Sequence, residues 1–304
     1  MSGVPFLRLP QLVQSIALRQ VEVIDLITLS FCSRKVKKLV RSANVQIDTL
    51  ILDLRSAEFS IKVNNVFSLE YSSQAGSVYL KSSENQEFPL FRTSDTAESV
   101  TSHVIGHLFE TFIRIETVKV NSYLPSLLDH SLWNYRKEID DLVVFSFPED
   151  NTKKMSVAEM KLIFEELTVT RLLHIHRAVD AGYQHSEGFS QDKVKIYNGE
   201  WVNFEAWLNC KCTCISLNAV STPTSTQMNT ILKLWLAKEK FENLMILSVG
   251  AKTGEAFADG LLAEVLDSIQ HETVRGITRI RRVDGKPGYV GLSEKYFSFA
   301  VIDI

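Results

Sequence analysis

The sequence lacks the features that mark several classes of protein. Its 304 residues include only 4 cysteines, too few and too unevenly spaced for a disulfide framework. No apolar run approaches the roughly 20 residues that cross a bilayer. The apolar N-terminus is interrupted by charges and has no small-residue cleavage site after it, so we expect no secretory signal. There is also no Asn-x-Ser/Thr glycosylation acceptor, and we expect a cytoplasmic and/or nuclear protein.

Signatures of catalysis and of nucleic-acid binding are also missing. The net charge is −3, which gives no overall electrostatic attraction to nucleic acid or to an anionic membrane. The stretch 250–256, GAKTGEA, resembles a phosphate loop but lacks the Gly-Lys-Ser/Thr order. No Gly-x-Ser-x-Gly elbow and no recognisable Cys or Ser nucleophile motif occurs. We therefore expect no enzyme and no cofactor.

Three groups of residues could still bind a metal. Cys210, Cys212 and Cys214 alternate, and on a strand they would share one face, whereas zinc prefers Cys-x₂-Cys spacing with partners elsewhere. We interpret them as buried small hydrophobic residues. The pairs His103/His107, at helical spacing, and His174/His176, on a predicted strand, each lack a visible third ligand. We expect the helical pair to lie on a surface or an interface.

The first part of the chain, in contrast, is rich in apolar residues with helical periodicity. A helix is predicted after Pro10, with Leu12, Val13 and Ile16 on it. A second is predicted over 21–29, and a third, with one basic side, is capped by Ser30 or Ser33. Three helices in about 40 residues cannot bury this much apolar surface alone. Either they pack onto the rest of the chain or one face is an exposed docking patch.

The pair Leu9-Pro10, the helix behind it and the stretch 29–35, LSFCSRK, resemble an F-box, in particular that of the large nematode F-box families. The resemblance implies that this segment docks on the Skp subunit of a cullin–RING ubiquitin ligase. It also implies a set of residues that divide between partner contact and internal packing: Leu9, Pro10, Val13, Ile16, Ile24, Leu26, Leu29 and Val36. Gln11 departs from the family, which often has an acidic residue there, so the helix cap is expected to be weaker.

The next segment is rich in predicted strands. Residues 45–56 alternate apolar and polar side chains, and short strands follow over 59–73 and 76–83, with Asn, Ser and Gly at the turns. This pattern predicts an antiparallel meander. Residues 82–99 are polar and contain Pro89, so we expect a loop that leads into a helix capped near Ser94 or Asp95.

Predicted strands then alternate with predicted helices. The strands are expected over 115–120, 141–147, 169–176, 193–198, 212–218 and 243–249, and the helices near 97–112, 125–138, 155–167, 202–209 and 224–238. Such alternation implies parallel pairing. The spacing is close to that of a leucine-rich repeat, although the repeat consensus is absent. We favour an irregular repeat-like solenoid over a doubly wound α/β domain.

Residues 193–249 resemble the F-box-associated domain, type 2, of the same nematode families, notably in the helix 228–236, MNTILKLWL. Residues 277–302 are similar to the family's closing β-hairpin, with a turn at Asp284-Gly285. The predicted organisation is therefore a three-helix F-box over 1–45 and an α/β body over 46–304, closed by the hairpin. Within that body the F-box-associated domain covers about 190–304.

These features lead to two hypotheses for function. The first is a non-enzymatic, substrate-recognition adaptor of an SCF-type cullin–RING ubiquitin ligase, which brings an unknown target protein close to the ubiquitin-charged enzyme. It needs no nucleic acid and no membrane. The alternative is a self-contained α/β enzyme whose N-terminal helices form a packing or dimerisation arm. The adaptor requires an uncovered apolar face within residues 5–40, whereas the enzyme requires that these residues be buried and that the body hold a deep pocket.

Overall fold

A computed structural model describes most of the chain. The described residues are 6–55, 58–72, 76–82, 87–123, 126–128, 130–145, 154–220, 224–251, 263–266, 271–293 and 295–302. The chain divides into two compact units, unit 1 over Met1–Asp140 and unit 2 over Asp141–Ile304. The boundary falls inside strand β7 (Glu138–Val144). Among the described residues, no helix combines the length and the apolar character that a membrane span requires.

Unit 1 begins with helices, as the periodicity predicted. A short 3₁₀ turn is followed by three helices: η1 (Phe6–Arg8), α1 (Gln11–Leu18), α2 (Val23–Cys32) and α3 (Arg34–Ala43). Ser33 caps α3, because its Oγ accepts a hydrogen bond from the Val36 amide at 3.2 Å. Asn44 ends α3 in the left-handed conformation, with φ 53°, that asparagine tolerates better than most residues.

The predicted meander is present. Its strands are β1 (Gln46–Leu54), β2 (Glu58–Val63), β3 (Phe67–Ser72), β4 (Ser77–Ser82) and β5 (Glu87–Arg92), each antiparallel to the one before. Asn64 and Asn65, both with positive φ, make the tight turn between β2 and β3. On its other side β1 pairs in parallel with β6 (Arg114–Ser122).

The loop expected over 82–99 is wrong, because β5 occupies part of it. Pro89 was interpreted as a break, yet β5 pairs only with β4 in the strand order and is the edge strand of unit 1. Proline is tolerated at an edge because no further strand needs its missing N–H. The following helix is α4 (Ala97–Thr111), and its cap is Thr96 rather than Ser94 or Asp95, with Oγ1 accepting from the Ser99 amide at 3.3 Å.

The helix expected over 125–138 is also wrong. The described part of this segment contains only a 3₁₀ turn, η2 (Ser131–Asn134). Two local hydrogen bonds hold it: His130 Nδ1 accepts from the Leu132 amide at 3.0 Å, and Trp133 Nε1 donates to the Leu127 carbonyl at 2.7 Å. These side-chain hydrogen bonds take the place of the backbone hydrogen bonds of the α-helix that the apolar content predicted.

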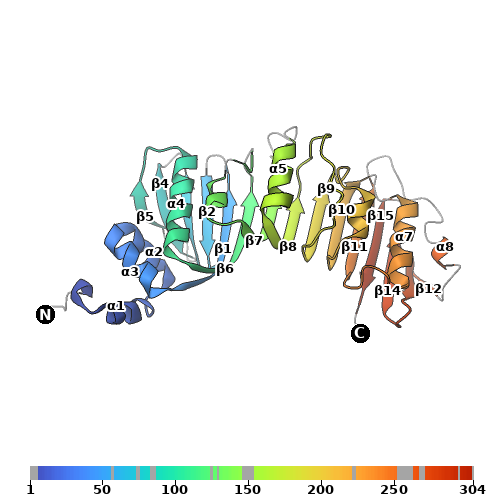
Figure 1. Cartoon of the computed structure of the whole chain (residues 1–304), viewed down its shortest axis with the longest axis horizontal. Helices are drawn as coiled ribbons and strands as arrows, with labels where there is room; N and C mark the ends of the chain where they lie inside the picture. The colour runs from blue at the N-terminus through green and yellow to red at the C-terminus, as the bar shows by residue number, and fades with distance from the viewer. Residues whose placement is uncertain are drawn as a thin grey trace. The chain divides into compact units, whose positions relative to one another are not determined.

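Unit 2 follows the predicted alternation of strands and helices. Its parallel strands are β8 (Thr168–Ile175), β9 (Lys193–Tyr197), β10 (Cys214–Val220) and β11 (Ile246–Ala251). The helices before and between them are α5 (Val157–Lys161), the π-helical turn η3 (Leu162–Glu166), α6 (Phe204–Leu208) and α7 (Ser225–Leu236). The α/β class is thus confirmed, and the repeat-like solenoid stays a prediction. In Figure 1, α7 lies in front of the strands of its own unit, and α4 lies in front of those of unit 1.

The C-terminal part of unit 2 is antiparallel. The strand order continues from β11 through β15 (Tyr296–Val301), β14 (Pro287–Leu292) and β13 (Ile277–Arg281) to β12 (His271–Val274), with a short helix α8 (Ala263–Leu266) earlier in the chain. The predicted hairpin joins β13 to β14. Gly285, with φ 91°, takes the turn position that a side chain would strain, and Asp284 accepts two hydrogen bonds from Arg282 at 2.9 and 2.8 Å.

Candidate protein-docking surface

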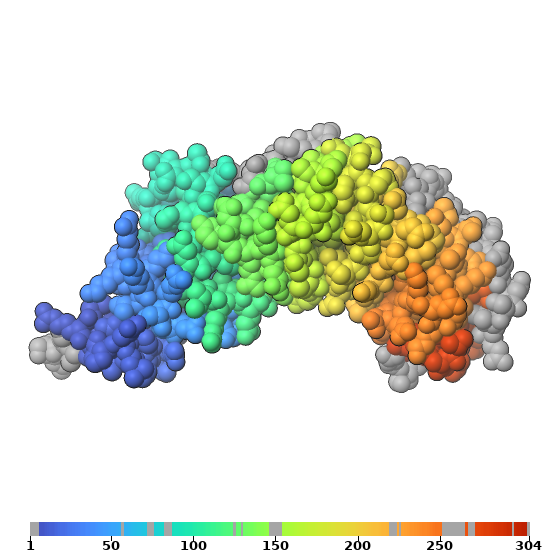
Figure 2. Space-filling model, viewed as in Figure 1, coloured from blue at the N-terminus to red at the C-terminus, as the bar shows by residue number. Residues whose placement is uncertain are grey.

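Helix α1 carries an apolar face that the described part of the chain does not cover. Its exposed side chains are Leu12, Val13 and Ile16, which are 71%, 44% and 53% exposed. Positions 12 and 16, and 13 and 16, share one side of a helix, so the three form a continuous patch, here called the α1 face. Leu7 and Leu29 add exposed apolar side chains, at 46% and 39%. In Figure 2, the dark blue atoms of the N-terminal helices form an outer lobe of unit 1.

A buried amide holds the start of α1 in place. Pro10 occupies the cap position and provides no side-chain hydrogen bond to the helix. Instead Gln14, 6% exposed, donates from Nε2 to the carbonyls of Phe6 and Leu9 at 3.1 and 2.8 Å. At the other end Arg19 Nε donates to the Ala43 carbonyl at 2.8 Å, which joins α1 to the end of α3. The role of Gln14 could not be predicted from the sequence, because a glutamine in a helix usually faces water.

The structure separates the eight predicted contact residues by exposure: Pro10, Val13, Ile16 and Leu29 are exposed, Leu9, Ile24 and Val36 are partly exposed, and Leu26 is fully buried. Leu26 therefore belongs to internal packing and cannot touch a partner in this conformation. Leu12 is the most exposed apolar residue of the helix and was missing from the predicted set. Helical spacing could have included it, because it lies one turn before Ile16.

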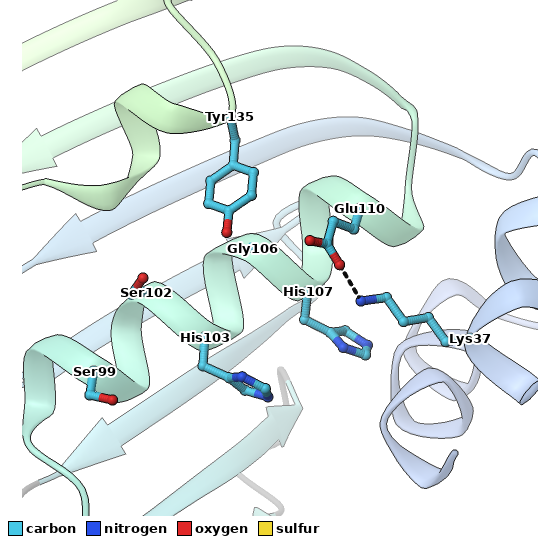
Figure 3. Close-up of a pocket in the computed structure, with 8 residues that line it drawn as sticks. All are labelled: Lys37, Ser99, Ser102, His103, Gly106, His107, Glu110 and Tyr135. Carbon is cyan, nitrogen blue, oxygen red and sulfur yellow. Dashed lines mark hydrogen bonds and ion pairs between the residues drawn. The ribbon is translucent and has the colours of Figure 1, made fainter. Parts of the chain in front are cut away.

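Helices α2 and α3, in contrast, contact α4 within unit 1 through hydrogen-bonded, stacked and ion-paired side chains. Ser30 Oγ donates its proton to the Ile27 carbonyl at 2.7 Å and so accepts the N–H of His107 Nε2 at 2.8 Å. Phe31 stacks on the His107 ring at 3.8 Å between ring centres. Lys37 of α3 pairs with Glu110 of α4 at 2.7 Å. Figure 3 shows His107, Glu110 and Lys37 at this junction.

The histidine pair of α4 is therefore only partly what was expected. His103 is exposed, whereas His107 is 8% exposed and forms part of the internal junction. Burial, together with the nearby charges of Lys37 and His103, lowers the pKa of His107 to about 4. A neutral imidazole at physiological pH agrees with its role as a single donor to Ser30.

A polar cavity of about 380 Å³ lies beside this junction. It is lined by Lys37, Ser99, Ser102, His103, Gly106, His107, Glu110 and Tyr135. The Tyr135 hydroxyl approaches Gly106 so closely that a Cβ there would clash with it (Figure 3). No group of three His, Cys, Asp or Glu side chains suited to a metal ion occurs among the described residues.

Two cysteines of the triplet are buried, as interpreted from the sequence, and Cys214 is partly exposed. Only Cys214 belongs to β10, while Cys210 and Cys212 precede it and are buried. Cys210 Sγ donates to the Ala206 carbonyl at 3.2 Å. A side-chain hydrogen bond between Cys212 and Cys210, together with burial, raises the pKa of the Cys212 thiol. The GAKTGEA stretch lies outside the described residues from position 252 onward.

The helices and strands over 188–249 form a tightly packed core in unit 2. Trp207 of α6 and Trp235 of α7 are 2% and 0% exposed. Trp207 and Ile231 meet Ile215 of β10 and Leu247 of β11, which are also buried. Trp235 contacts the Phe299 ring of β15. Ile231 and Trp235, one helical turn apart on α7, are therefore both buried, and this side of α7 is apolar.

Two protein-family models match separate parts of the chain. A model described as F-box domain matches residues 6–47, and one described as F-box associated matches residues 188–249. The chain carries an F-box domain and an F-box-associated domain. The resemblance inferred from the sequence is thereby confirmed for both. No curated protein and no solved structure matches the chain.

This pair of domains has a general functional meaning. F-box and F-box-associated domains are typical of adaptors rather than enzymes, and together they point to a substrate-adaptor role in SCF ligases in general. An F-box domain implies binding of the Skp subunit. In this F-box the α1 face is the largest exposed apolar feature of the first three helices.

Proposed function

We propose that this protein is a substrate-recognition adaptor of an SCF-type cullin–RING ubiquitin ligase, acting in the cytoplasm and/or the nucleus. The F-box docks on the Skp subunit through the α1 face, and the body recruits a target protein. Ubiquitin transfer is carried out by the other subunits of the ligase, and the adaptor contributes proximity.

The exposure of the α1 face carries this proposal. Leu12 at 71% and Ile16 at 53% lie on a helix whose other side is closed by the buried Gln14 and Leu18. An exposed apolar patch of this kind marks a protein-interaction site, because leaving it in water has an unfavourable free energy. The enzyme alternative requires these helices to be buried, and the described α1 residues do not meet that requirement.

The proposal is tested by placing charge on the α1 face. We expect Leu12→Asp combined with Ile16→Asp to weaken binding of the Skp subunit at least about a hundredfold. Burying each of these side chains contributes about 1.5–3 kcal/mol, and a factor of ten in affinity corresponds to 1.4 kcal/mol. The measurement is a titration of the purified Skp subunit with the full chain by calorimetry.

Val66→Asp is the matched control. Val66 is 59% exposed at the turn after β2, in the same unit but outside the three N-terminal helices. The Val66→Asp variant should bind the Skp subunit with the affinity of the wild type. Unchanged affinity in the double variant, with a wild-type circular dichroism spectrum in both proteins, would remove the α1 face from the docking model.

A further inference from the structure

One face of the sheet in unit 2 is not covered by the helices that pack on the other. Ile215, Leu217 and Leu247 point toward α6 and α7, where Trp207 and Ile231 meet them. Successive strand residues point to opposite sides. The side chains between these apolar ones therefore face away from the helices, and they form what we call the open sheet face.

The strand register arranges the open sheet face in rows. One row runs across five strands through His174, Lys195, Ser216, Ser248 and Ser298. A neighbouring row contains Leu172, Lys193, Cys214, Ile246 and Ala300. Ile246 is 48% exposed and Lys193 is exposed, so this side of the sheet is open to solvent in the described structure.

Most strands of this sheet carry no carboxylate side chain. Strands β8, β9, β10, β11, β13, β14 and β15 contain no Asp or Glu, in a chain whose net charge is −3. Lys193 and Lys195 form no ion pair with any described residue. Glu272 on the edge strand β12 lies opposite Arg279 and offsets that positive charge. The unpaired positive charge of the open sheet face is therefore that of the two lysines of β9.

The groups around His174 are consistent with a positively charged sheet face. Burial and then the positive charges of His176 and Lys195 lower its pKa to about 4, and no carboxylate acts in the opposite direction. The rings of His174, His176 and Tyr197 pack together, and Lys195 lies opposite His174 in the strand register. His176 stacks on Tyr197 at 4.2 Å and on Phe145 at 5.3 Å.

We propose that the open sheet face, centred on Lys193 and Lys195, binds a carboxylate-rich, extended segment of the recruited protein. This inference rests on the adaptor function proposed above. Lys193 and Lys195 are two residues apart on one strand, about 6.6–7 Å along it. Glu residues at alternate positions of an extended peptide have the same spacing, so each carboxylate can meet one ammonium group.

A protein segment fits this face better than a nucleic acid. Single-stranded nucleic acids bind by stacking bases on exposed aromatic faces. Here the faces of His176 and Tyr197 are already stacked on each other, at an interplanar angle of 16°. What is left for a ligand is positive charge beside partly exposed polar and apolar side chains.

The test uses the full chain and fluorescence anisotropy with labelled synthetic peptides. An alternating Glu-Ser peptide is compared with Gln-Ser and Lys-Ser peptides of equal length. We expect the Glu-Ser peptide to bind most tightly and to lose affinity as salt is raised. Lys193→Gln combined with Lys195→Gln should weaken its binding at least about fivefold, as expected for two partly exposed ion pairs.

Lys35→Gln combined with Lys38→Gln makes the same change in net charge on the exposed side of α3 and should leave peptide binding unchanged. Equal binding of Glu-Ser and Gln-Ser peptides, or equal losses in the two double variants, would overturn the proposal. So would tighter binding of an oligouridine or a phosphoserine peptide than of the Glu-Ser peptide at the same lysines. The β9 variant should still bind the Skp subunit, so a failure of this inference is distinct from a failure of F-box docking.

Discussion

Removing the side chain of Trp235 should destabilise the protein more than any surface change in unit 2. The indole is 0% exposed, contacts the Phe299 ring edge-to-face at 4.8 Å and lies 5.3 Å below the Arg282 guanidinium. Burial of an aromatic side chain of 150–250 Å² at about 25 cal/mol per Å² contributes roughly 4–6 kcal/mol. An alanine at this position still buries some apolar surface and so retains part of this free energy. We therefore expect Trp235→Ala to lower the free energy of unfolding by about 3–5 kcal/mol.

The measurement is urea unfolding of the full chain followed by far-ultraviolet circular dichroism. Two further variants make the interpretation specific. Trp235→Phe keeps an aromatic ring and removes an indole N–H that has no hydrogen-bond partner among the described residues, so it should lose much less stability than Trp235→Ala. Tyr296→Ala removes an aromatic residue that is 60% exposed on β15 and should lose less than about 1 kcal/mol. A loss below about 1 kcal/mol for Trp235→Ala would refute the assigned packing of α7 on the sheet.

Two other changes follow from the structure. Stability should fall as pH decreases from about 6.5 toward 4, because burial lowers the pKa values of His107 and His130 to about 4 and the unfolded chain therefore binds more protons in this window. Urea midpoints at several pH values measure this, and midpoints that do not change between pH 7 and pH 4.5 would contradict it. Gly285→Ala should lower the free energy of unfolding by about 1–2 kcal/mol, because alanine at φ 91° is strained. Gly182→Ala is its control, since a Cβ at that position meets no atom within 4 Å.

The sequence predicted elements well where a local pattern decides the structure. Three N-terminal helices, the meander of β1 to β4 and the strands β6 to β11 were all expected from periodicity, with ends shifted by a few residues. Prediction from the sequence failed where contacts between residues far apart in the chain decide the local structure. β5 forms in spite of Pro89 because only one of its edges is paired. The helix expected near 125–138 gives way to side-chain bonds from His130 and Trp133.

The apolar N-terminal helices could be located from the sequence, but their residues could not be divided into exposed and buried ones. Leu26 and Leu29 lie three residues apart on α2, yet one is 0% and the other 39% exposed. Periodicity indicates that both are apolar and on neighbouring sides of a helix. It does not reveal which side α4 covers, and that depends on the contact between Ser30 and His107, 77 residues apart in the chain.

The same contact explains how an exposed apolar face can be presented without loosening unit 1. The Ser30 hydroxyl, the Phe31 ring and the Lys37 ammonium each bind a residue of α4, so α2 and α3 are fixed on three sides of one junction. Helix α1 reaches this junction through Arg19 and the end of α3, while its outer side stays uncovered. A helix supported in this way is already ordered before the proposed docking takes place. Binding then loses less conformational entropy than it would for a helix that folds on contact. Ser30→Ala should accordingly weaken Skp binding less than the α1 double variant does, because the hydroxyl supports the face without forming part of it.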